Sequence, residues 1–348
     1  MIVLHNPSGL LHSTVELLGA QLIPALECPE RITAIVGALS ASSHHTIRTI
    51  NFDLSQIDKQ AEPSDHNGPS SPSSPSPSLI SFIAATHIPA YLKHLSTIFQ
   101  TWSAAGLVQL DSCILPECFT LPRPDHSLPP PSEPKDIYAR VGYYAFDMSS
   151  GINAHSYQAI LGSANLALEG PSPGHPATTA MARAAGATAT SITPPWLVLY
   201  VSIHGRDEFP YYTGSAAETG AGAGAGFNVN LPLDTGSSYA EYAQLLDAAI
   251  ARIREHAPRF LVVSLGFDTF ELDPLGKFGI EMGDYERMAR AVRKGVMKKK
   301  KGGRMTEAGD EGEGPVEMAL ILLEGGYVVD RLGENMLSFL KGWEEEDD

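Results

Sequence analysis

The hydrophobic pattern of the chain predicts several amphipathic helices. Apolar residues recur at intervals of three and four in residues 89–102, 240–255 and 285–292, which places them on one face of a helix. The same spacing returns in residues 332–343 and predicts a C-terminal helix. Each of these helices would bury one apolar stripe and keep its opposite face in water.

Three short apolar runs alternate with these helices. Residues 196–203, 260–265 and 318–323 contain almost no polar side chains, as is typical of strands that are covered on both faces. Buried strands that alternate with helices favour a parallel sheet with helices on both of its faces. The sequence therefore predicts an α/β fold.

Two segments interrupt the pattern. Residues 63–78 are mostly proline and serine, a composition that cannot bury apolar surface, so we expect a disordered insertion there. Residues 298–317 open with four lysines and continue through a charged, glycine-rich run, which predicts a surface-loop insertion. The lysines fit either a solvated loop or a nuclear localisation signal. Because patterned sequence resumes after both segments, we expect residues 1–348 to form a single domain.

The charge of the chain disfavours one class of partner. Its 348 residues carry 24 Lys and Arg against 40 Asp and Glu, which gives a formal net charge of −16. Contact with nucleic-acid phosphates needs clustered cations, so we expect no direct nucleic-acid binding. The chain also lacks a signal-peptide pattern, an apolar run of about 18 residues that could span a membrane, and enough cysteines for a disulfide framework. We expect a nuclear or cytoplasmic protein with no membrane contact, rather than a secreted one.

Polar residues follow all three predicted strands, at the edge where open α/β sheets bind their ligands. His204 follows the first strand, Asp268 the second and Tyr327 the third. A carboxylate in such a position can ligate a metal ion, and a tyrosine hydroxyl can stabilise an oxyanion. Taken singly, each residue is explained more readily by a turn, by packing or by a hydrogen bond to the backbone.

Taken together, the strand ends resemble the zinc-dependent histone deacetylase superfamily, and most of all its acetylpolyamine amidohydrolase-like members. The stretches that carry the resemblance are LYVSIHG, FPYYTGSAAETGAGAGAGFNVNLPL, VVSLGFDTFELDPLGKF and LEGGYVVD, which follow the family's order and spacing. The resemblance implies an arginase/deacetylase-like parallel sheet. It extends to residues 16–31 and 141–170, which look like the family's N-terminal helices.

The resemblance also implies roles for particular residues. Family enzymes hydrolyse the acetamide of acetyl-lysine or of an acetylpolyamine with a zinc ion that polarises the carbonyl and activates water. Asp268 matches a zinc ligand, Tyr327 the tyrosine that stabilises the oxyanion, and His175 the first histidine of the proton-transferring pair. The further matches are a substrate channel formed by Phe209, Leu275, Gly325 and Gly326, and a monovalent-cation (potassium) site at Ser202 and the carbonyl of Ile203.

The chain departs from the family where the metal should be held. Pro176 stands in the place of the second histidine. The family then has a helix and a strand ending in Asp-x-Asp-x-His-His, which supplies two of the three zinc ligands, whereas residues 177–195 contain no Asp, Glu, Cys or His. These residues are also too few for that helix, strand and loops, so one central strand is predicted to be missing. His204, Asp207 or Asp273 would replace the lost donors only through a chance match of geometry.

This loss sets the functional expectation. Each missing ligand removes bond energy and preorganisation, so we expect zinc binding and deacetylase activity to be absent or very weak. Three interpretations stay open: an impaired deacetylase, a pseudoenzyme that binds acetyl-lysine without hydrolysing it, and a truncated product of a normal deacetylase gene. Acetylated chromatin proteins and acetylpolyamines are both open as substrates. Polyamine-type members tend to pair, so a homodimer is one expected state.

Overall fold

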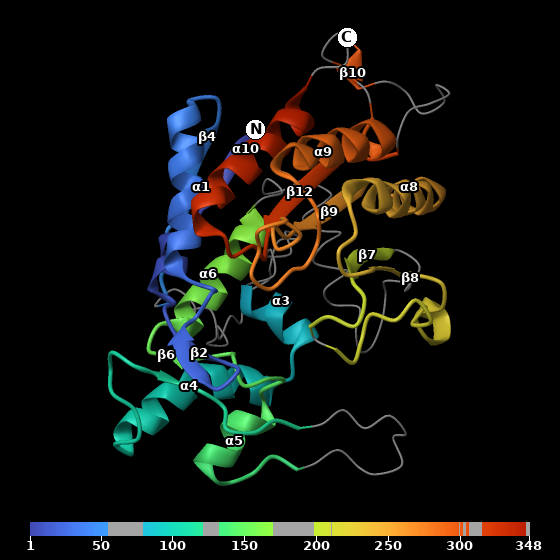
Figure 1. Ribbon diagram of the computed structural model, residues 1–348. Helices are drawn as coiled ribbons and strands as arrows, with labels where there is room; N and C mark the ends of the chain where they lie inside the picture. Colours follow the sequence, from blue (N-terminus) through green and yellow to red (C-terminus); the bar gives the residue numbers. More distant parts are fainter. Residues whose placement is uncertain are drawn as a thin grey trace, which may run out of the picture. The chain divides into compact units, whose positions relative to one another are not determined.

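The chain divides into two compact units, and Figure 1 shows the helices and strands of each. The computed structural model describes residues 1–54, 79–120, 132–169, 198–209, 211–298, 300–301, 304–305 and 315–345. Unit 1 comprises Met1–Val3, Thr33–Ile47 and Gly170–Asp348, and unit 2 comprises Leu4–Ile32 and Arg48–Glu169. The predicted insertion at residues 63–78 lies outside the described residues. The single domain expected from the sequence stays a prediction.

Unit 2 opens with a hairpin in the segment that looked like a family helix. Strand β2 (Val15–Leu18) pairs antiparallel with β3 (Gln21–Pro24), and Leu17 lies opposite Leu22. Gly19 makes the turn with a φ of +61°, which a residue without a side chain adopts readily. The helical expectation is therefore wrong for residues 15–24. The first helix, α1 (Pro29–Ser42), begins only afterwards, with its proline in the first turn.

Helix α4 (Pro89–Ala104) of unit 2 agrees with the pattern of the sequence, whereas residues 141–170, which look like family helices, are helical only up to Tyr143 and from Ser156 to Glu169. Helix α4 covers the predicted segment, and Ile98, Phe99 and Trp102 are buried along one side of it. They pack with Ile114 and Val141 into the core of this unit. The other elements of unit 2 are η1 (Pro7–Leu11), α3 (Leu79–Thr86), β5 (Cys113–Ile114), α5 (Ile137–Tyr143), β6 (Ile152–Asn153) and α6 (Ser156–Glu169). Strand β1 (Ile2–His5) pairs with β4 (Thr46–Thr49).

Unit 1 contains the predicted parallel strands. Strand β7 (Tyr200–Gly205) pairs parallel with β8 (Asn228–Leu233), and β9 (Phe260–Leu265) pairs parallel with β12 (Met318–Leu323). The α/β prediction is confirmed, although among the described residues the strands form two-stranded ladders rather than one continuous sheet. The helices follow the expected order, as α8 (Tyr239–His256), α9 (Met282–Val296) and α10 (Val329–Glu344). The short element η4 (Gly222–Gly224) lies between β7 and β8, and β10 (Lys300–Lys301) and β11 (Arg304–Met305) lie between α9 and β12.

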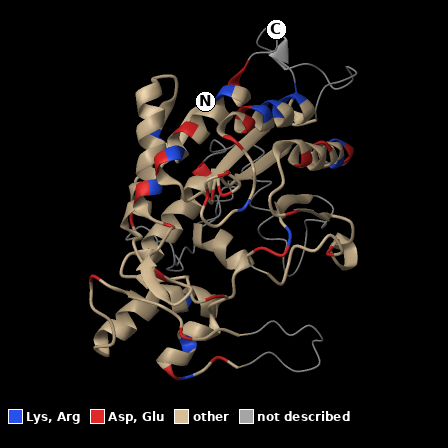
Figure 2. Ribbon diagram, in the orientation of Figure 1, with Lys and Arg blue, Asp and Glu red and all other residues tan. Residues whose placement is uncertain are grey.

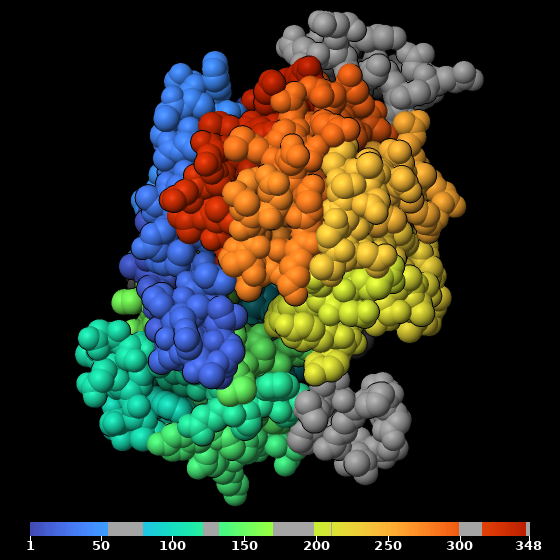
Figure 3. All heavy atoms as spheres, in the orientation of Figure 1, coloured from blue at the N-terminus to red at the C-terminus, as the bar shows by residue number. Residues whose placement is uncertain are grey.

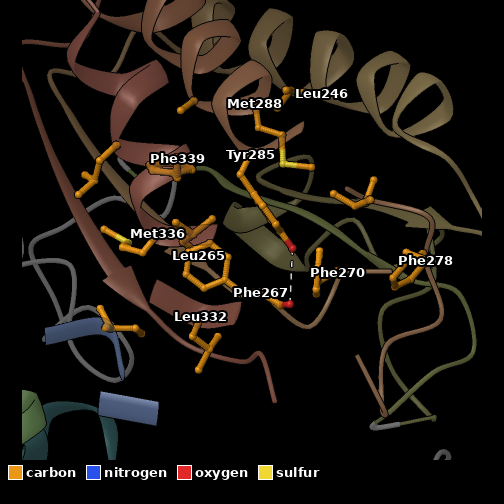
Figure 4. Packing of buried hydrophobic residues seen from close by; sticks show 14 of the residues in the cluster. Leu246, Leu265, Phe267, Phe270, Phe278, Tyr285, Met288, Leu332, Met336 and Phe339 are labelled. Atoms are coloured by element: carbon orange, nitrogen blue, oxygen red, sulfur yellow. Dashed lines mark hydrogen bonds between the residues drawn. The ribbon is translucent and has the colours of Figure 1, made fainter. Parts of the chain in front are cut away.

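The core of unit 1 lies between these three helices and the β9–β12 pair. Tyr285 of α9 is fully buried there, and its ring meets Phe267 edge-on, with ring centroids 5.0 Å apart (Figure 4). Helices α9 and α10 pack side by side, as the orange and red surfaces of Figure 3 show. Gly342 permits this approach, because a β-carbon there would stand 2.0 Å from the carbonyl oxygen of Glu286 on α9.

The strands are less covered than the sequence predicts. Leu265 of β9 packs into the core, whereas Val262, on the opposite face of the same strand, is 42% exposed. Leu323 at the end of β12 is 41% exposed. Among the described residues, the expectation that both faces are covered is therefore wrong for β9, because Val263 and Leu265 pack into the core while Val262 on the other face stays exposed.

Two further features of unit 1 concern its surface. Both acidic and basic residues lie along α9 and α10 (Figure 2), and Glu286 pairs with both Arg290 and Lys341. The segment after α9 returns to its starting point, because the Val316 N–H donates to the carbonyl of Val296 over 2.9 Å. Both of these valines are fully buried. This backbone hydrogen bond thus links the end of α9 to the residues just before β12.

Candidate active site

The pairing of β9 with β12 brings two of the predicted site segments together. The register places Leu265 beside Leu323, so the chain leaves both strands at the same edge. Beyond the strands, the Phe267 N–H donates to the carbonyl of Gly325 over 2.8 Å. The loop that carries Asp268 therefore runs alongside the turn that leads to Tyr327.

The Asp268 carboxylate lies between two glycines. Its Oδ1 is 2.7 Å from the point where a β-carbon on Gly266 would stand, and its Oδ2 is 2.7 Å from the corresponding point on Gly325. Gly276 is similarly close, because a β-carbon there would stand 1.6 Å from the Asp268 backbone oxygen. The glycines leave the space that the half-buried carboxylate occupies. Close packing around Asp268 thus explains why the GGY and LGK stretches of the sequence contain glycine.

Asp273 holds the two segments to each other. Its side chain is buried, and its Oδ1 accepts the N–H groups of Leu275 and Gly276 over 2.9 and 3.0 Å. Its Oδ2 accepts the Tyr327 N–H over 2.7 Å. One carboxylate thus bonds to both loops. Asp273 is not placed to act as a substitute metal ligand, because it belongs to no group of three His, Cys, Asp or Glu side chains among the described residues.

His204 is also engaged through both of its ring nitrogens. Its Nε2 lies 2.8 Å from the carbonyl oxygen of Gly214, and its Nδ1 lies 2.8 Å from the Ser202 hydroxyl. A carbonyl can only accept, so in the neutral ring Nε2 carries the hydrogen and Ser202 donates to Nδ1. The histidine ties the loop at Gly214 to β7 and has no nitrogen left for a metal. The potassium site at Ser202 and Ile203 stays a prediction.

The predicted channel residues are accessible. Phe209 is 63% exposed and Leu275 is 40% exposed. Phe209 contacts the ring of Tyr211 edge-on, and Tyr211 contacts Tyr212 in the same way. These three rings form an aromatic surface on the loop after β7, which can pack against the methylene groups of a bound chain.

Tyr285 contacts the Asp268 loop from its buried side. Its hydroxyl lies 3.1 Å from Thr269 Oγ1 and 3.5 Å from the carbonyl oxygen of Phe267 (Figure 4). Burial is the main cause that raises the pKa of Tyr285, and the nearby Asp268 charge adds to it. The hydroxyl therefore stays protonated and is a donor toward the loop.

We expect the substitution Tyr285→Phe to lower the free energy of unfolding of unit 1 by about 1–2 kcal/mol, because it removes the hydroxyl that donates to the carbonyl of Phe267 and bonds to Thr269 Oγ1. Urea unfolding followed by circular dichroism measures this change. Tyr200→Phe, at a tyrosine that is 57% exposed, is the control and should stay within about 0.5 kcal/mol of the unsubstituted protein. Equal effects of the two substitutions would contradict a supporting role for Tyr285.

The described residues do not fit the family's zinc site. Across the described parts of the chain, no three His, Cys, Asp or Glu side chains come close enough to hold a metal ion together. His204 and Asp273 are engaged as stated above, and Asp207 is exposed on a backbone with a φ of +54°. His175 lies outside the described residues. No catalytic step is therefore derived through a metal.

Comparison with known proteins identifies the family. The model of the histone deacetylase domain matches residues 187–343. Acetylpolyamine amidohydrolase 2 of Pseudomonas aeruginosa is 30% identical, and the match covers 96% of this chain and 95% of that protein. The chain belongs to the histone deacetylase superfamily. The acetylpolyamine amidohydrolase of Mycoplana ramosa is 24% identical over 98% of both chains.

The fold of this deacetylase-family chain agrees with solved structures. The acetylpolyamine aminohydrolase of Burkholderia pseudomallei superposes with a TM-score of 0.70 over 99% of this chain and 98% of that one, at 24% identity. At this level of identity the match shows the fold alone. It confirms the arginase/deacetylase-like α/β class that the sequence predicts. No described helix has both the length and the apolarity needed to cross a bilayer.

The alignment lengths also show how many positions of its relatives have no counterpart in this deacetylase-family chain. The alignment with the Pseudomonas protein is 383 positions long, yet it includes only 96% of 348 residues, or about 334. About 49 positions of that protein therefore have no counterpart here. The alignment with the Mycoplana protein, 390 positions over 98% of this chain, leaves the same number.

The sequence predicted the strand-end residues of the site but not the residues behind them. The loop of Asp268 runs beside the turn of Gly325 and Gly326, because both follow paired parallel strands, while the roles predicted for Asp268 and Tyr327 stay predictions. The sequence gives no sign that Asp273 links the two loops, because its hydrogen-bond partners are backbone N–H groups, which every residue except proline carries. Tyr285 carried no signal either, since a tyrosine on the apolar face of a helix is typical of any core.

Proposed function

We propose that this chain binds acetylated primary amines, either acetylpolyamines or acetyl-lysine, at the ends of β7, β9 and β12, and hydrolyses them weakly or not at all. One observation carries the proposal. The Asp268 loop and the Tyr327 turn converge, while the described residues contain no group of three metal donors. The curated relatives named acetylpolyamine amidohydrolases support the choice of ligand.

The site offers a partner for each part of an acetylated amine. An acetamide has one hydrogen-bond acceptor and one donor. The Tyr327 hydroxyl can donate to its carbonyl oxygen, and the Asp268 carboxylate can accept its N–H. The methylene groups next to the amide can pack on Phe209, whose ring is exposed. These contacts recognise the acetyl group and do not require a metal.

Hydrolysis needs more than these contacts. The zinc ion of family enzymes polarises the carbonyl and generates the nucleophile near neutral pH. The described residues hold no replacement for it, and Pro176 cannot exchange a proton in place of the second histidine. Tyr327 can stabilise an oxyanion, but a water molecule without a base or a Lewis acid remains a poor nucleophile.

The proposal is tested on the purified full-length chain. We expect substoichiometric zinc, no robust release of acetate, and tighter binding of N-acetylputrescine or an acetyl-lysine peptide than of the unacetylated forms by titration calorimetry. Tyr327→Phe should weaken the binding of the acetylated probes about 5–10-fold, because one hydrogen bond contributes about 1 kcal/mol. Tyr138→Phe, at an exposed tyrosine of unit 2, is the control and should leave binding unchanged.

Stoichiometric zinc with robust turnover would contradict the loss of activity. Equal affinity for the acetylated and unacetylated probes would contradict the binding function. Three finer expectations belong to the same proposal: potassium at Ser202 and Ile203, a homodimer, and a nuclear or cytoplasmic location.

A second interpretation is that the chain is a truncated product of a gene for an active deacetylase. About 49 positions of two relatives have no counterpart here, and residues 177–195 are the segment in which the sequence departs from the family. Sequencing the transcript across the codons for residues 177–195 tests this interpretation. An in-frame segment encoding Asp-x-Asp-x-His-His would support it, and a continuous match to the present chain would exclude it.

A further inference from the structure

Asp273 has an unusual set of partners for a residue outside the reacting groups. It is 7% exposed, and its two carboxylate oxygens accept three backbone N–H groups. Two of these, from Leu275 and Gly276, belong to its own loop, and the third belongs to Tyr327, which is 54 residues away in the sequence. The bond to Tyr327 is the shortest of the three, at 2.7 Å.

These bonds hold both halves of the site. The Gly276 backbone approaches the Asp268 carbonyl so closely that no side chain would fit there, so closing the loop at Gly276 also holds the backbone of Asp268. On the other side, Gly326 has a φ of +113°, a conformation that glycine alone adopts readily, and it directs the chain into Tyr327. Asp273 bonds to the first N–H after that turn.

A negative charge suits this role better than a neutral amide does. A carboxylate offers two acceptor oxygens and no donor, so it can bind N–H groups on both sides at once. Hydrogen bonds to a charged acceptor are shorter and about twice as strong as neutral ones. An asparagine at this position would keep one acceptor oxygen, but its NH2 group is a donor and would face one of the backbone N–H groups without forming a hydrogen bond.

We propose that Asp273 is the positioning residue of the site, which sets the backbone of Tyr327 relative to Asp268 and thereby the place of the tyrosine hydroxyl. That Asp273 affects the binding of an acetylated amine (the binding consequence) rests on the function proposed above. That it fixes the backbone of Tyr327 (the backbone consequence) does not. Asp273 itself does not touch the acetylated amine.

Hydrogen exchange on the full-length chain, without ligand, tests the backbone consequence. We expect the Tyr327 amide to be protected in the unsubstituted protein and to exchange about 10–100-fold faster in Asp273→Asn, the range that losing a charged hydrogen bond implies. The amide of Val263 in β9 should keep its protection. Asp136→Asn, which alters a carboxylate that caps α5 with two N–H bonds, is the matched control and should leave the Tyr327 amide unchanged.

A double-mutant cycle tests the binding consequence. Asp273→Asn should weaken the binding of N-acetylputrescine about as much as Tyr327→Phe does, and the double variant should bind no more weakly than either single variant. Fully additive losses would show that Asp273 does not act through Tyr327 and would overturn the proposal. Fast exchange of the Tyr327 amide in the unsubstituted protein would also overturn it, even if Asp273→Asn did not fold. If the probe does not bind at all but the exchange results hold, the proposed function fails and the positioning role stands.

Discussion

Replacing Gly342 by alanine is expected to lower the free energy of unfolding of unit 1 by about 2–3 kcal/mol. The new β-carbon would stand 2.0 Å from the carbonyl oxygen of Glu286 and 3.0 Å from its α-carbon. These are backbone atoms of α9, which cannot turn away as a side chain can, so α9 and α10 must separate. Separation would also loosen the Glu286–Lys341 ion pair at the same place. Urea unfolding followed by circular dichroism measures the loss.

Gly283 provides the matched control for this substitution. It lies in the first turn of α9, and a β-carbon there would meet no atom within 4 Å. Gly283→Ala should therefore leave stability unchanged or raise it by up to about 1 kcal/mol, because alanine has the higher helix propensity. If the two alanine substitutions changed stability alike, helix propensity rather than the contact between α9 and α10 would explain the Gly342 result.

Acidification is expected to destabilise unit 2 through His94. This residue of α4 is 4% exposed, its ring centroid lies 4.5 Å from that of Tyr144, and its Nδ1 has no hydrogen-bond partner among the described residues. Burial lowers the pKa of His94 from 6.5 to about 4, and the charge of Arg140 adds to this effect while Glu133 opposes it. The folded state thus holds the ring neutral, whereas the unfolded chain binds a proton below about pH 6.5.

The sign of the effect follows from this difference. Stability is fully present above pH 6.5 and is lost as the pH falls toward 4, by about 2–3 kcal/mol between pH 7 and pH 4.5. His94→Phe should remove this loss and should be at least as stable at pH 7, because it eliminates a buried nitrogen without a partner. Urea unfolding at both pH values, followed by the fluorescence of the buried Trp102, measures it.

His87 provides a control near the same helix. It is exposed, and its ring contacts Tyr91, so a phenylalanine keeps that contact. His87→Phe should show the same loss on acidification as the unsubstituted protein. If His94→Phe showed the same loss as well, other titrating groups would account for the acid sensitivity.

The fold could be predicted where packing follows the sequence period. The segments that became α4, α8, α9 and α10 carry apolar residues at helical spacing, and β9 and β12 begin and end where their apolar runs do. The hairpin at residues 15–24 could not be predicted, because Leu17 and Leu22 are apolar yet remain partly exposed, so the alternation that marks a strand is absent. The exposure of Val262 could not be predicted either, because an apolar run does not reveal which of its faces lacks a partner.

The candidate site could be predicted as far as side chains follow strand ends. Asp268 and Tyr327 follow paired parallel strands, and the geometry of such a pair brings the two loops that carry them side by side. His204 was expected just after its strand, but it lies within β7, and its environment gave it a different role, since Ser202 and Gly214 occupy both of its nitrogens. Such assignments depend on hydrogen bonds to the backbone, which the sequence does not encode by residue type.

The hydrogen bond between Val296 and Val316, at the two ends of the segment between α9 and β12, has a practical consequence. Val296 and Val316 are buried and hydrogen-bonded to each other, so the chain between them begins and ends at one fixed point. Closing a flexible loop costs only about 0.6 kcal/mol more for each doubling of its length. If residues 298–317 form the surface-loop insertion that the sequence predicts, an epitope or a small fluorescent domain spliced in there should have little effect on the stability of unit 1, which would make this position suitable for labelling the protein in cells.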